Sequence, residues 1–294
     1  TVNGSRTLEA RFSAIQYTIT LKANPTGAGS PSASPRSAYV GQTVTLTANP
    51  GSCYNFSSWT APAGVTITNN QFVMPAQNVT ATANYTIKTY TIAVNVTKTG
   101  NSPNTPGTVS GAGTYNCGSS ATLVATPATG FSFTGWYEGT TRVSTSATYT
   151  FTVNGSRTLE ARFSAIQYNI TVIANPTSGG SPAAPNSAYV GQIITLSPNP
   201  NSSCYDFNNW TVSAGELISK YQLIMPAQNV TATANYTAKQ YNVTLSVNNS
   251  SYGSVIGGGK YDCGSTVTIT ASPNPGYQFV NWSDGNTSNP RTIT

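Results

Sequence analysis

The sequence predicts an all-β protein, and three observations support that prediction. Apolar and polar residues alternate with a period of two in short segments such as Thr43–Thr47, where Val44 and Leu46 face one way and threonines the other. The 294 residues include 26 Gly and 18 Pro together with abundant Thr, Ser and Asn, a composition that favours short strands joined by turns. No segment of useful length shows the periodicity of an amphipathic helix.

Long internal repeats organise the chain. The segment Thr1–Tyr17 (TVNGSRTLEARFSAIQY) occurs again, letter for letter, at Thr152–Tyr168, an offset of 151 residues. A second identical tract, MPAQNVTATANYT, occupies Met74–Thr86 and Met225–Thr237 with the same offset. The period is itself double, because four segments open alike: IQYTIT at 15, KTYTIA at 88, IQYNIT at 166 and KQYNVT at 239.

These repeats predict four small β-rich domains, stacked linearly and alternating between two subtypes. We call them the first (14–86), second (87–163), third (164–237) and fourth (238–294) repeats; the first and third are of subtype B, the second and fourth of subtype A. Residues 1–13 are expected to be the last strand of a preceding or neighbouring-copy repeat, a strand that the fourth repeat lacks. Units of about 70 residues can just hold a core alone, so links between neighbours would help.

Each complete repeat is expected to follow one plan, which ends in an alternating strand. A Tyr-led strand comes first, then a Gly/Pro/Ser turn region, an alternating strand, an aromatic strand, a short strand and the final strand. In the first repeat these segments are residues 17–21, 25–35, 43–47, 54–59, 72–74 and 79–85.

An aromatic motif identifies the family that the chain resembles. The motif recurs as Tyr54/Phe56/Trp59, Phe131/Phe133/Trp136, Tyr205/Phe207/Trp210 and Tyr277/Phe279/Trp282. With stretches such as GQTVTLTANP and FVMPAQNVTATANY, and with the terminal pattern T-L-x-A-x-F, the whole chain resembles divergent internalin-type B-repeats. The resemblance implies a small, β-grasp-like module strung in tandem in secreted and surface proteins, without a family-wide catalytic site. Cys53 and Cys204 depart from the motif, which usually has Gly there.

Four cysteines, one in each repeat, exclude a disulfide inside any repeat: Cys53, Cys117, Cys204 and Cys263. In subtype B the cysteine follows the alternating strand, and in subtype A it precedes that strand, so the two positions lie at opposite ends of a strand about 25 Å long at ~3.3 Å per residue. If repeats stack head to tail, a subtype B cysteine faces a subtype A cysteine.

Two pairing schemes satisfy this geometry. We favour Cys53–Cys117 with Cys204–Cys263, because all four then close within the chain. The alternative pairs Cys117 with Cys204 and leaves the outer two for neighbouring copies. Free buried thiols are a third interpretation, whereas a metal site is disfavoured because there is no His and no CxxC. Disulfides would place the chain outside a reducing cytosol.

Two further residue classes are candidate sites. The four tryptophans, Trp59, Trp136, Trp210 and Trp282, recur at one strand position and are therefore expected in the core, with stacking platforms for sugars as the alternative. Asn-x-Ser/Thr sequons are frequent, and an N-glycosylating source would coat the surface with glycans. The best candidates for modification are Asn78, Asn84, Asn229 and Asn235.

The charged residues argue against catalysis and nucleic-acid binding. Only 7% of residues are charged, and the net charge of +6 is spread singly along the chain, without the basic stripe of a nucleic-acid binder. The chain has no His and only seven acids, so the commonest general base is absent. We expect no enzyme activity and no cofactor. No apolar run approaches the ~18 residues that a membrane-spanning helix needs.

The two ends of the chain suggest self-assembly. Joining Thr294 to Thr1 gives NPRTIT-TVNGSRTLEARF, which resembles SATYTF-TVNGSRTLEARF of the second repeat. Either a longer polypeptide continues the array, or Thr1–Phe12 inserts into the open fourth repeat of another molecule by β-augmentation. The sequence therefore predicts a structural protein of the cell surface, a stalk or filament stiffened by inter-repeat disulfides, with sequons that an N-glycosylating source would modify. An adhesin whose repeats bind carbohydrate or protein is the alternative.

Overall fold

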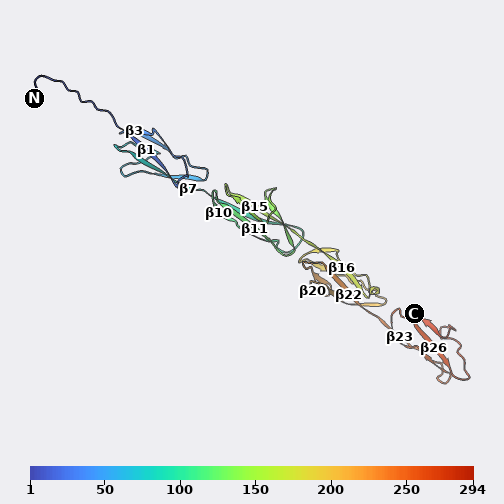
Figure 1. The fold of residues 1–294 in the computed structure, drawn as a ribbon. Coiled ribbons are helices and arrows are strands. Elements are labelled where there is room, and N and C mark those ends of the chain that lie inside the picture. Colours follow the sequence, from blue (N-terminus) through green and yellow to red (C-terminus); the bar gives the residue numbers. More distant parts are fainter. The chain divides into compact units, whose positions relative to one another are not determined.

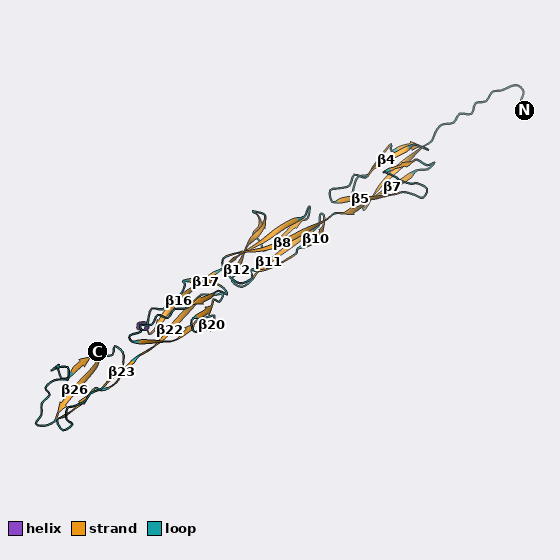
Figure 2. Cartoon of the chain, turned by 180° about the vertical axis from the view of Figure 1, so that it is seen from behind, coloured by secondary structure: helices purple, strands orange, loops and turns teal.

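A computed structural model describes residues 1–294, and strands joined by loops form the chain (Figure 1). The single helical element is the three-residue 3₁₀ turn η1 (Thr177–Gly179), coloured purple in Figure 2. No helix in the structure is long and apolar enough to cross a membrane. The all-β fold class predicted from the sequence is confirmed.

Every repeat contributes its own set of strands. The first repeat contains β1 (Gln16–Asn24), β2 (Ser32–Ser34), β3 (Ser37–Tyr39), β4 (Thr43–Thr47), β5 (Tyr54–Thr60), β6 (Gln71–Val73) and β7 (Val79–Ile87). The second contains β8 (Thr89–Thr99), β9 (Gly107–Ser110), β10 (Gly113–Asn116), β11 (Ser120–Pro127), β12 (Phe131–Glu138), β13 (Thr141–Ser144), β14 (Thr148–Thr152) and β15 (Arg157–Ala165). The third contains β16 (Gln167–Asn175), η1, β17 (Ser187–Tyr189), β18 (Ile193–Thr195), β19 (Tyr205–Val212), β20 (Glu216–Ser219), β21 (Gln222–Ile224) and β22 (Val230–Ala238). The fourth contains β23 (Gln240–Val243), β24 (Gly253–Ile256), β25 (Gly259–Asp262), β26 (Val267–Pro273) and β27 (Arg291–Ile293).

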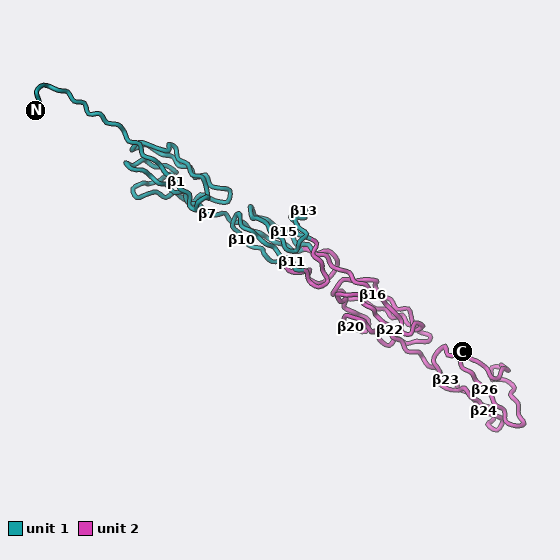
Figure 3. Tube along the Cα trace, in the orientation of Figure 1, with its two compact units in different colours: residues 1–96, 109–126, 135–162 teal, residues 97–108, 127–134, 163–294 magenta.

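The chain forms two compact units, coloured separately in Figure 3. Unit 1 consists of residues 1–96, 109–126 and 135–162, and unit 2 of residues 97–108, 127–134 and 163–294. The first repeat therefore lies in unit 1, the third and fourth lie in unit 2, and the second contributes to both.

The last strand of the first repeat is the centre of its main sheet, whose order is β3-β1-β7-β5. β7 pairs in parallel with β1, with Ile19 opposite Val79, and antiparallel with β5, with Trp59 opposite Ala83. Every second residue of β7 is buried, so its alternating sequence matches the period-two prediction. A second sheet, β2-β4-β6, supplies the other side of the core. Core side chains from both sheets include Val44, Leu46, Phe72, Val79 and Ala81.

The third repeat has the same plan as the first. Its main sheet has the order β17-β16-β22-β19, and β22 again pairs in parallel with its first strand and antiparallel with the aromatic strand. The smaller sheet is β18-β21-β20. The repeat of 151 residues in sequence is thus a repeat in structure.

The second repeat also places its last strand at the centre, in a sheet of order β10-β8-β15-β12-β13, beside the smaller sheet β14-β11-β9. Three alternate side chains of β15 are fully buried, namely Leu159, Ala161 and Phe163. The fourth repeat has only the pair β23-β25 and the sheet β24-β26-β27, with no strand equivalent to β15. Only Val267 and Ile269 are buried there.

Residues 1–15 contain no strand, although the sequence suggested a strand over residues 1–13 (Figure 2). Leu8 and Phe12 are 91% and 94% exposed, whereas the identical side chains of β15, Leu159 and Phe163, are fully buried. One sequence therefore has two structures in this chain, because Arg157–Ala165 has partner strands and the equivalent N-terminal residues have none.

Two short strands were not predicted from the sequence. β2 lies in the segment 25–35 where turns were expected and pairs with β4, and β3 follows it and pairs with the start of β1. Each is three residues long, which is too short for a period of two to be recognised.

We expect the first and third repeats to lose stability at alkaline pH because of Tyr85 and Tyr236. Burial raises the pKa of both phenols above the ordinary value of 10.0, and their hydroxyls donate to the carbonyls of Ala48 and Pro198. This stabilisation is complete below the unfolded-state pKa of about 10 and is lost as pH rises through the folded-state pKa. The double variant Y85F/Y236F should be less stable at neutral pH by about 1 kcal/mol per hydrogen bond. Its stability should change less between about pH 9 and pH 11.

Urea unfolding at a series of pH values measures both effects. Tyr39→Phe is the control, because that ring is 39% exposed on the same repeat. An alkaline loss of stability as steep in Y85F/Y236F as in the parent chain would contradict the assignment.

Candidate functional site at the repeat joints

Two disulfides each join consecutive repeats. Cys53 is bonded to Cys117 within unit 1, and Cys204 to Cys263 within unit 2, which are the pairs favoured from the sequence. The Cα atoms are 5.2 Å apart in both, and the bonds close sequence separations of 64 and 59 residues. No cysteine is free. Each bond links a subtype B repeat to the subtype A repeat that follows it.

The strands that meet at a joint are separated by a single residue. Lys88 alone separates β7 from β8, Ile166 separates β15 from β16, and Lys239 separates β22 from β23. The central strand of one repeat therefore continues directly into the first strand of the next.

Strand pairing on either side of this linker brings the cysteines together. Cys53 directly precedes β5, whose first residue, Tyr54, lies opposite Ile87 at the end of β7. Cys117 directly follows β10, whose last residue, Asn116, lies opposite the first residue of β8. Both cysteines therefore lie beside the linker, one on each repeat. The disulfide therefore links the start of β5 in the first repeat to the end of β10 in the second repeat.

A lysine at the linker holds both sides of each disulfide. The backbone amide of Lys88 donates to the carbonyl of Cys53 at 2.8 Å, and its carbonyl accepts from the amide of Cys117 at 2.8 Å. The ammonium group donates to the carbonyl of Ser52 at 2.9 Å. Lys88 therefore makes hydrogen bonds to both cysteine-containing segments, one in each repeat.

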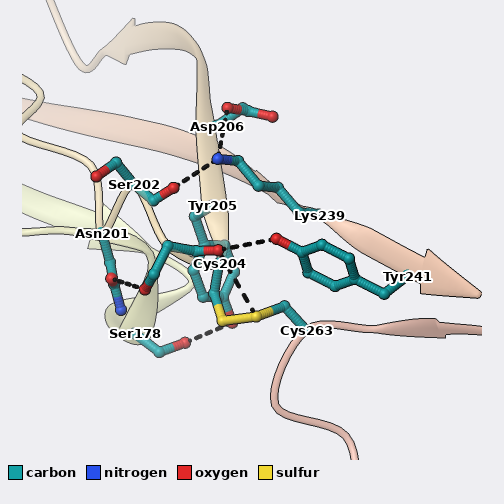
Figure 4. Close-up of a disulfide and its surroundings, with 10 residues drawn as sticks. Ser178, Asn201, Ser202, Cys204, Tyr205, Asp206, Lys239, Tyr241 and Cys263 are labelled. Atoms are coloured by element: carbon teal, nitrogen blue, oxygen red, sulfur yellow. Dashed lines mark hydrogen bonds and ion pairs between the residues drawn. A yellow bond between two sulfur atoms is a disulfide. The ribbon is translucent and has the colours of Figure 1, made fainter.

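Lys239 makes the same contacts at the joint between the third and fourth repeats (Figure 4). Its amide donates to the carbonyl of Cys204 at 2.7 Å, and its carbonyl accepts from the amide of Cys263 at 2.8 Å. Its Nζ donates to the carbonyl of Ser202 at 2.5 Å. Nζ also lies 3.7 Å from a carboxylate oxygen of Asp206. The Asp206 side chain is 74% exposed, so this ion pair adds little.

One side chain of β23 also crosses the joint. The hydroxyl of Tyr241 donates to the carbonyl of Ser203 at 3.2 Å, whereas the Gln240 amide donates to Asp262 at 2.8 Å within the fourth repeat. Sequence reasoning missed the role of Lys88 and Lys239. The available signal was that lysine opens both subtype A repeats (KTYTIA and KQYNVT), whereas subtype B repeats open with Ile-Gln.

The joint between the second and third repeats has no disulfide. The amide of Ile166 donates to the carbonyl of Gly130 at 2.8 Å, and Ser102, which is buried, donates from Oγ to the carbonyl of Val190 at 2.9 Å. A Cβ atom on Gly130 would lie 2.6 Å from Val190 Cγ2, so glycine permits the close approach. All four residues belong to unit 2.

The tryptophans differ in burial. Trp136 and Trp210 are 0% and 4% exposed, and Trp59 and Trp282 are half-buried. Trp59 packs against core residues of its repeat, and its indole nitrogen donates to Asn70 at 3.0 Å. None of the four is an exposed ring of the kind that a sugar-stacking platform requires.

One tryptophan has an unsatisfied polar atom. The indole nitrogen of Trp210 is buried without a hydrogen-bond partner. Tyr221 occupies the position equivalent to Asn70, which accepts the indole hydrogen bond of Trp59 in the first repeat. The Tyr221 ring stacks on Phe207 with the ring centroids 5.8 Å apart. The substitution exchanges an indole hydrogen bond for an aromatic contact.

Asn84 and Asn235 lie on the central strands, and their amides bond across the sheet. Asn84 accepts from Asn24 at 3.0 Å and lies 3.4 Å from both Ser58 Oγ and Thr60 Oγ1. Asn235 makes the equivalent contacts in the third repeat. The nitrogen to which a glycan would attach is therefore already engaged at both positions.

Asn78 and Asn229 are exposed and bond differently. Their side-chain oxygens accept from the amides of Thr18 and Asn169 at 2.8 and 2.9 Å, which leaves the side-chain nitrogens facing solvent. These two positions are therefore better placed for modification than Asn84 and Asn235.

Ion pairs in the structure join single acids to single arginines or lysines. Arg157 bonds Glu138 at 2.9 Å, which lowers the pKa of that carboxyl group, and its guanidinium lies 4.4 Å from the Phe151 ring. Arg291 bonds Asp284 and lowers its pKa in the same way. No group of three or more His, Cys, Asp or Glu side chains is placed to hold a metal ion.

Comparison with known proteins gives one family and one solved structure. The model of the divergent InlB B-repeat domain matches four times, at residues 19–89, 94–167, 170–240 and 243–294. No curated protein matches the chain. Among solved structures, the Bacillus anthracis TIE protein aligns at 8% identity with a TM-score of 0.39, over 76% of this chain and 51% of that chain. The chain spans about half the length of that protein, and so weak a likeness bears on neither fold nor function.

Replacing Lys239 by Met should expose the adjacent disulfide to reductant. The variant keeps the backbone bonds but loses the ammonium contacts with Ser202 and Asp206, which we expect to cost about 0.5–1.5 kcal/mol at this partly exposed site. Mass spectrometry after timed reduction should show faster loss of Cys204–Cys263. Lys260→Met is the matched control, since Lys260 is an exposed lysine on β25. Equal reduction rates would contradict the role of Lys239.

Glycan occupancy in an N-glycosylating host should be higher at Asn78 and Asn229 than at Asn84 and Asn235. All four belong to the duplicated tract MPAQNVTATANYT, so one glycopeptide reports both copies and its fragmentation separates the two sites. Predominant occupancy of Asn84 and Asn235 would show that the cross-sheet amide bonds do not protect these positions.

Proposed function

The chain belongs to the divergent InlB B-repeat domain family, and from that premise we propose that it is a structural protein of the cell surface. Its four tandem repeats serve as an extracellular stalk or filament, and its inter-repeat disulfides stiffen that stalk. The proposed work is mechanical: the chain holds its ends apart and transmits force between them.

The observation that carries this proposal is the construction of the two disulfide joints. A one-residue linker, a disulfide and a lysine that bonds both repeats act together at Lys88 and again at Lys239. A flexible binding array would need none of these, because long polar linkers suffice to string domains together. Three separate restraints at one joint favour a protein whose joints must resist bending.

Disulfides and family support an extracellular location. Disulfides persist in oxidising compartments and are rare in a reducing cytosol. The InlB B-repeat family, the two disulfides and the frequent sequons agree with a secreted protein that carries sites for N-glycosylation.

We further propose that the chain is not an enzyme and needs no cofactor. The sequence lacks His, and five of its seven acids form an ion pair with a single Arg or Lys. The alternative of an adhesin that stacks sugars on its tryptophans is disfavoured, since Trp136 and Trp210 are buried and Trp59 packs against its core.

Removing the first disulfide should loosen one joint and leave the other unchanged. In C53S/C117S, the distance distribution between dyes on the first and second repeats should broaden, because only the one-residue linker and hydrogen bonds remain. Exposed positions for labelling through non-cysteine chemistry are Val73 and Thr140. Single-molecule energy transfer on the whole chain measures the width of that distribution.

The variant C204S/C263S is the matched control, since it cuts the other disulfide and should leave this distribution narrow. Loss of a disulfide that closes about 60 residues is also expected to cost about 4 kcal/mol in the chain-entropy model. An unchanged distribution in C53S/C117S would mean that the disulfide does not stiffen the joint.

A further inference from the structure

The fourth repeat contains an open groove of about 550 Å³. Its walls are formed by residues 244–248 on one side and 277–283 on the other, with residues 252–255 and 271–273 completing the lining. Neither wall segment is a strand, although the equivalent segments are strands in the other three repeats. A strand needs ladder partners for its amides and carbonyls, and these two segments have none between them.

The second repeat shows what occupies this position. There β15 lies between β8 and β12, the counterparts of the two groove walls. Phe131 is 5% exposed beside β15, whereas its counterpart in the fourth repeat, Tyr277, is 49% exposed. The groove is thus the space of one central strand.

A matching strand is present at the other end of the chain. Residues 1–12 have the same sequence as residues 152–163, which end in β15. Their apolar side chains are almost fully exposed, with Val2, Leu8 and Phe12 at 88%, 91% and 94%. We propose that residues 1–12 of a second copy fill the groove of the fourth repeat as its central strand.

The register of this insertion follows from the complete repeats. In the first repeat Ile19 lies opposite Val79 in the parallel pair, and Trp59 lies opposite Ala83 in the antiparallel pair. Transferred through the aligned motifs, the same register sets Leu8 beside Leu245, Ala10 beside Trp282 and Phe12 beside Phe279. Side chains at alternate positions, Leu8, Ala10 and Phe12, then face the core, as Leu159, Ala161 and Phe163 do.

Polar groups in the fourth repeat match the inserted strand as well. In the second repeat the amide of Thr91 donates to Ser156 Oγ at 3.1 Å, and Asn242 is the counterpart whose amide would meet Ser5. Arg157 pairs with Glu138 at 2.9 Å. Asp284, the counterpart of Glu138, is paired with Arg291 in this chain and would share its carboxylate with Arg6 after insertion.

The surfaces flanking the strand are also complementary. Where the second and third repeats meet, Val190 packs on Gly130. The counterpart of Val190 in the first repeat, Val40, is 56% exposed, and the counterpart of Gly130 in the fourth repeat, Gly276, has nothing within 4 Å. Docking a second copy would bring Val40 onto Gly276 and reproduce the joint that the chain already contains.

Such a contact is a β-augmentation that joins the head of one copy to the tail of another. Because the donor and acceptor surfaces differ, the association need not close and can propagate into a filament. The inference extends the proposed function from one chain to its assembly. It does not depend on the stiffness of the disulfide joints, so each idea can fail without the other.

Sedimentation velocity over a range of concentrations tests the proposal on the whole chain. The parent chain should form concentration-dependent oligomers, and L8D/F12D should remain monomeric because two charges would enter the core of the groove. T7D/S13D is the matched control, since it adds the same charge at positions outside the set of inward-facing side chains and should still assemble. Both pairs of substitutions lie in exposed residues, so folding of the repeats is not at risk.

A synthetic peptide, TVNGSRTLEARF, provides the second measurement. It should bind saturably to monomeric L8D/F12D and change the fluorescence of Trp282, whereas the peptide carrying the two Asp substitutions should not bind. Three results would overturn the proposal: a parent chain that stays monomeric, equal assembly of L8D/F12D and T7D/S13D, or no binding of the peptide. Native material in which Thr294 is followed by a segment that fills the groove would also overturn it, by assigning the groove to a continuing chain.

Discussion

The structure depends on one constraint: the last strand of a repeat lies at the centre of that repeat's main sheet. β7, β15 and β22 each separate the first strand of the repeat from its aromatic strand, so a repeat cannot close its core before its final residues arrive. The same strand continues after one residue into the next repeat. Folding of a repeat and its connection to the following one are therefore consequences of one element.

The joints follow from this constraint. Because the central strand leaves the sheet between two neighbours, the segments beside it in consecutive repeats converge on the linker. At Lys88 and Lys239 those segments carry cysteines and are bonded covalently; at Ile166 they are held by packing on Gly130 and by the buried Ser102. Consecutive repeats are thus linked by a few local contacts at each joint, which suits repeats whose own cores are small.

Much of this could be predicted from the sequence, because the repeats are long and identical in part. The all-β class and the four-fold B-repeat array follow from alternation and from motifs present in every repeat. One cysteine per repeat excludes a disulfide inside a repeat but leaves two pairing schemes, and the structure contains the favoured one. The short strands β2 and β3, the lysines at the joints and the engaged amides of Asn84 and Asn235 could not be predicted. Each depends on which residues lie opposite one another across strands, and register is set by the folded sheet.

Hydrogen–deuterium exchange of the duplicated segment tests the central role of this strand most directly. Residues 7–12 and 158–163 have one sequence, so their peptic fragments share one mass and one intrinsic exchange rate. In dilute monomer the isotope envelope should be bimodal, with a slow population from β15 and a fast one from the N-terminal segment. In assembled material the account predicts a single slow envelope. A single envelope in the monomer, or an envelope that stays bimodal on assembly, would contradict it.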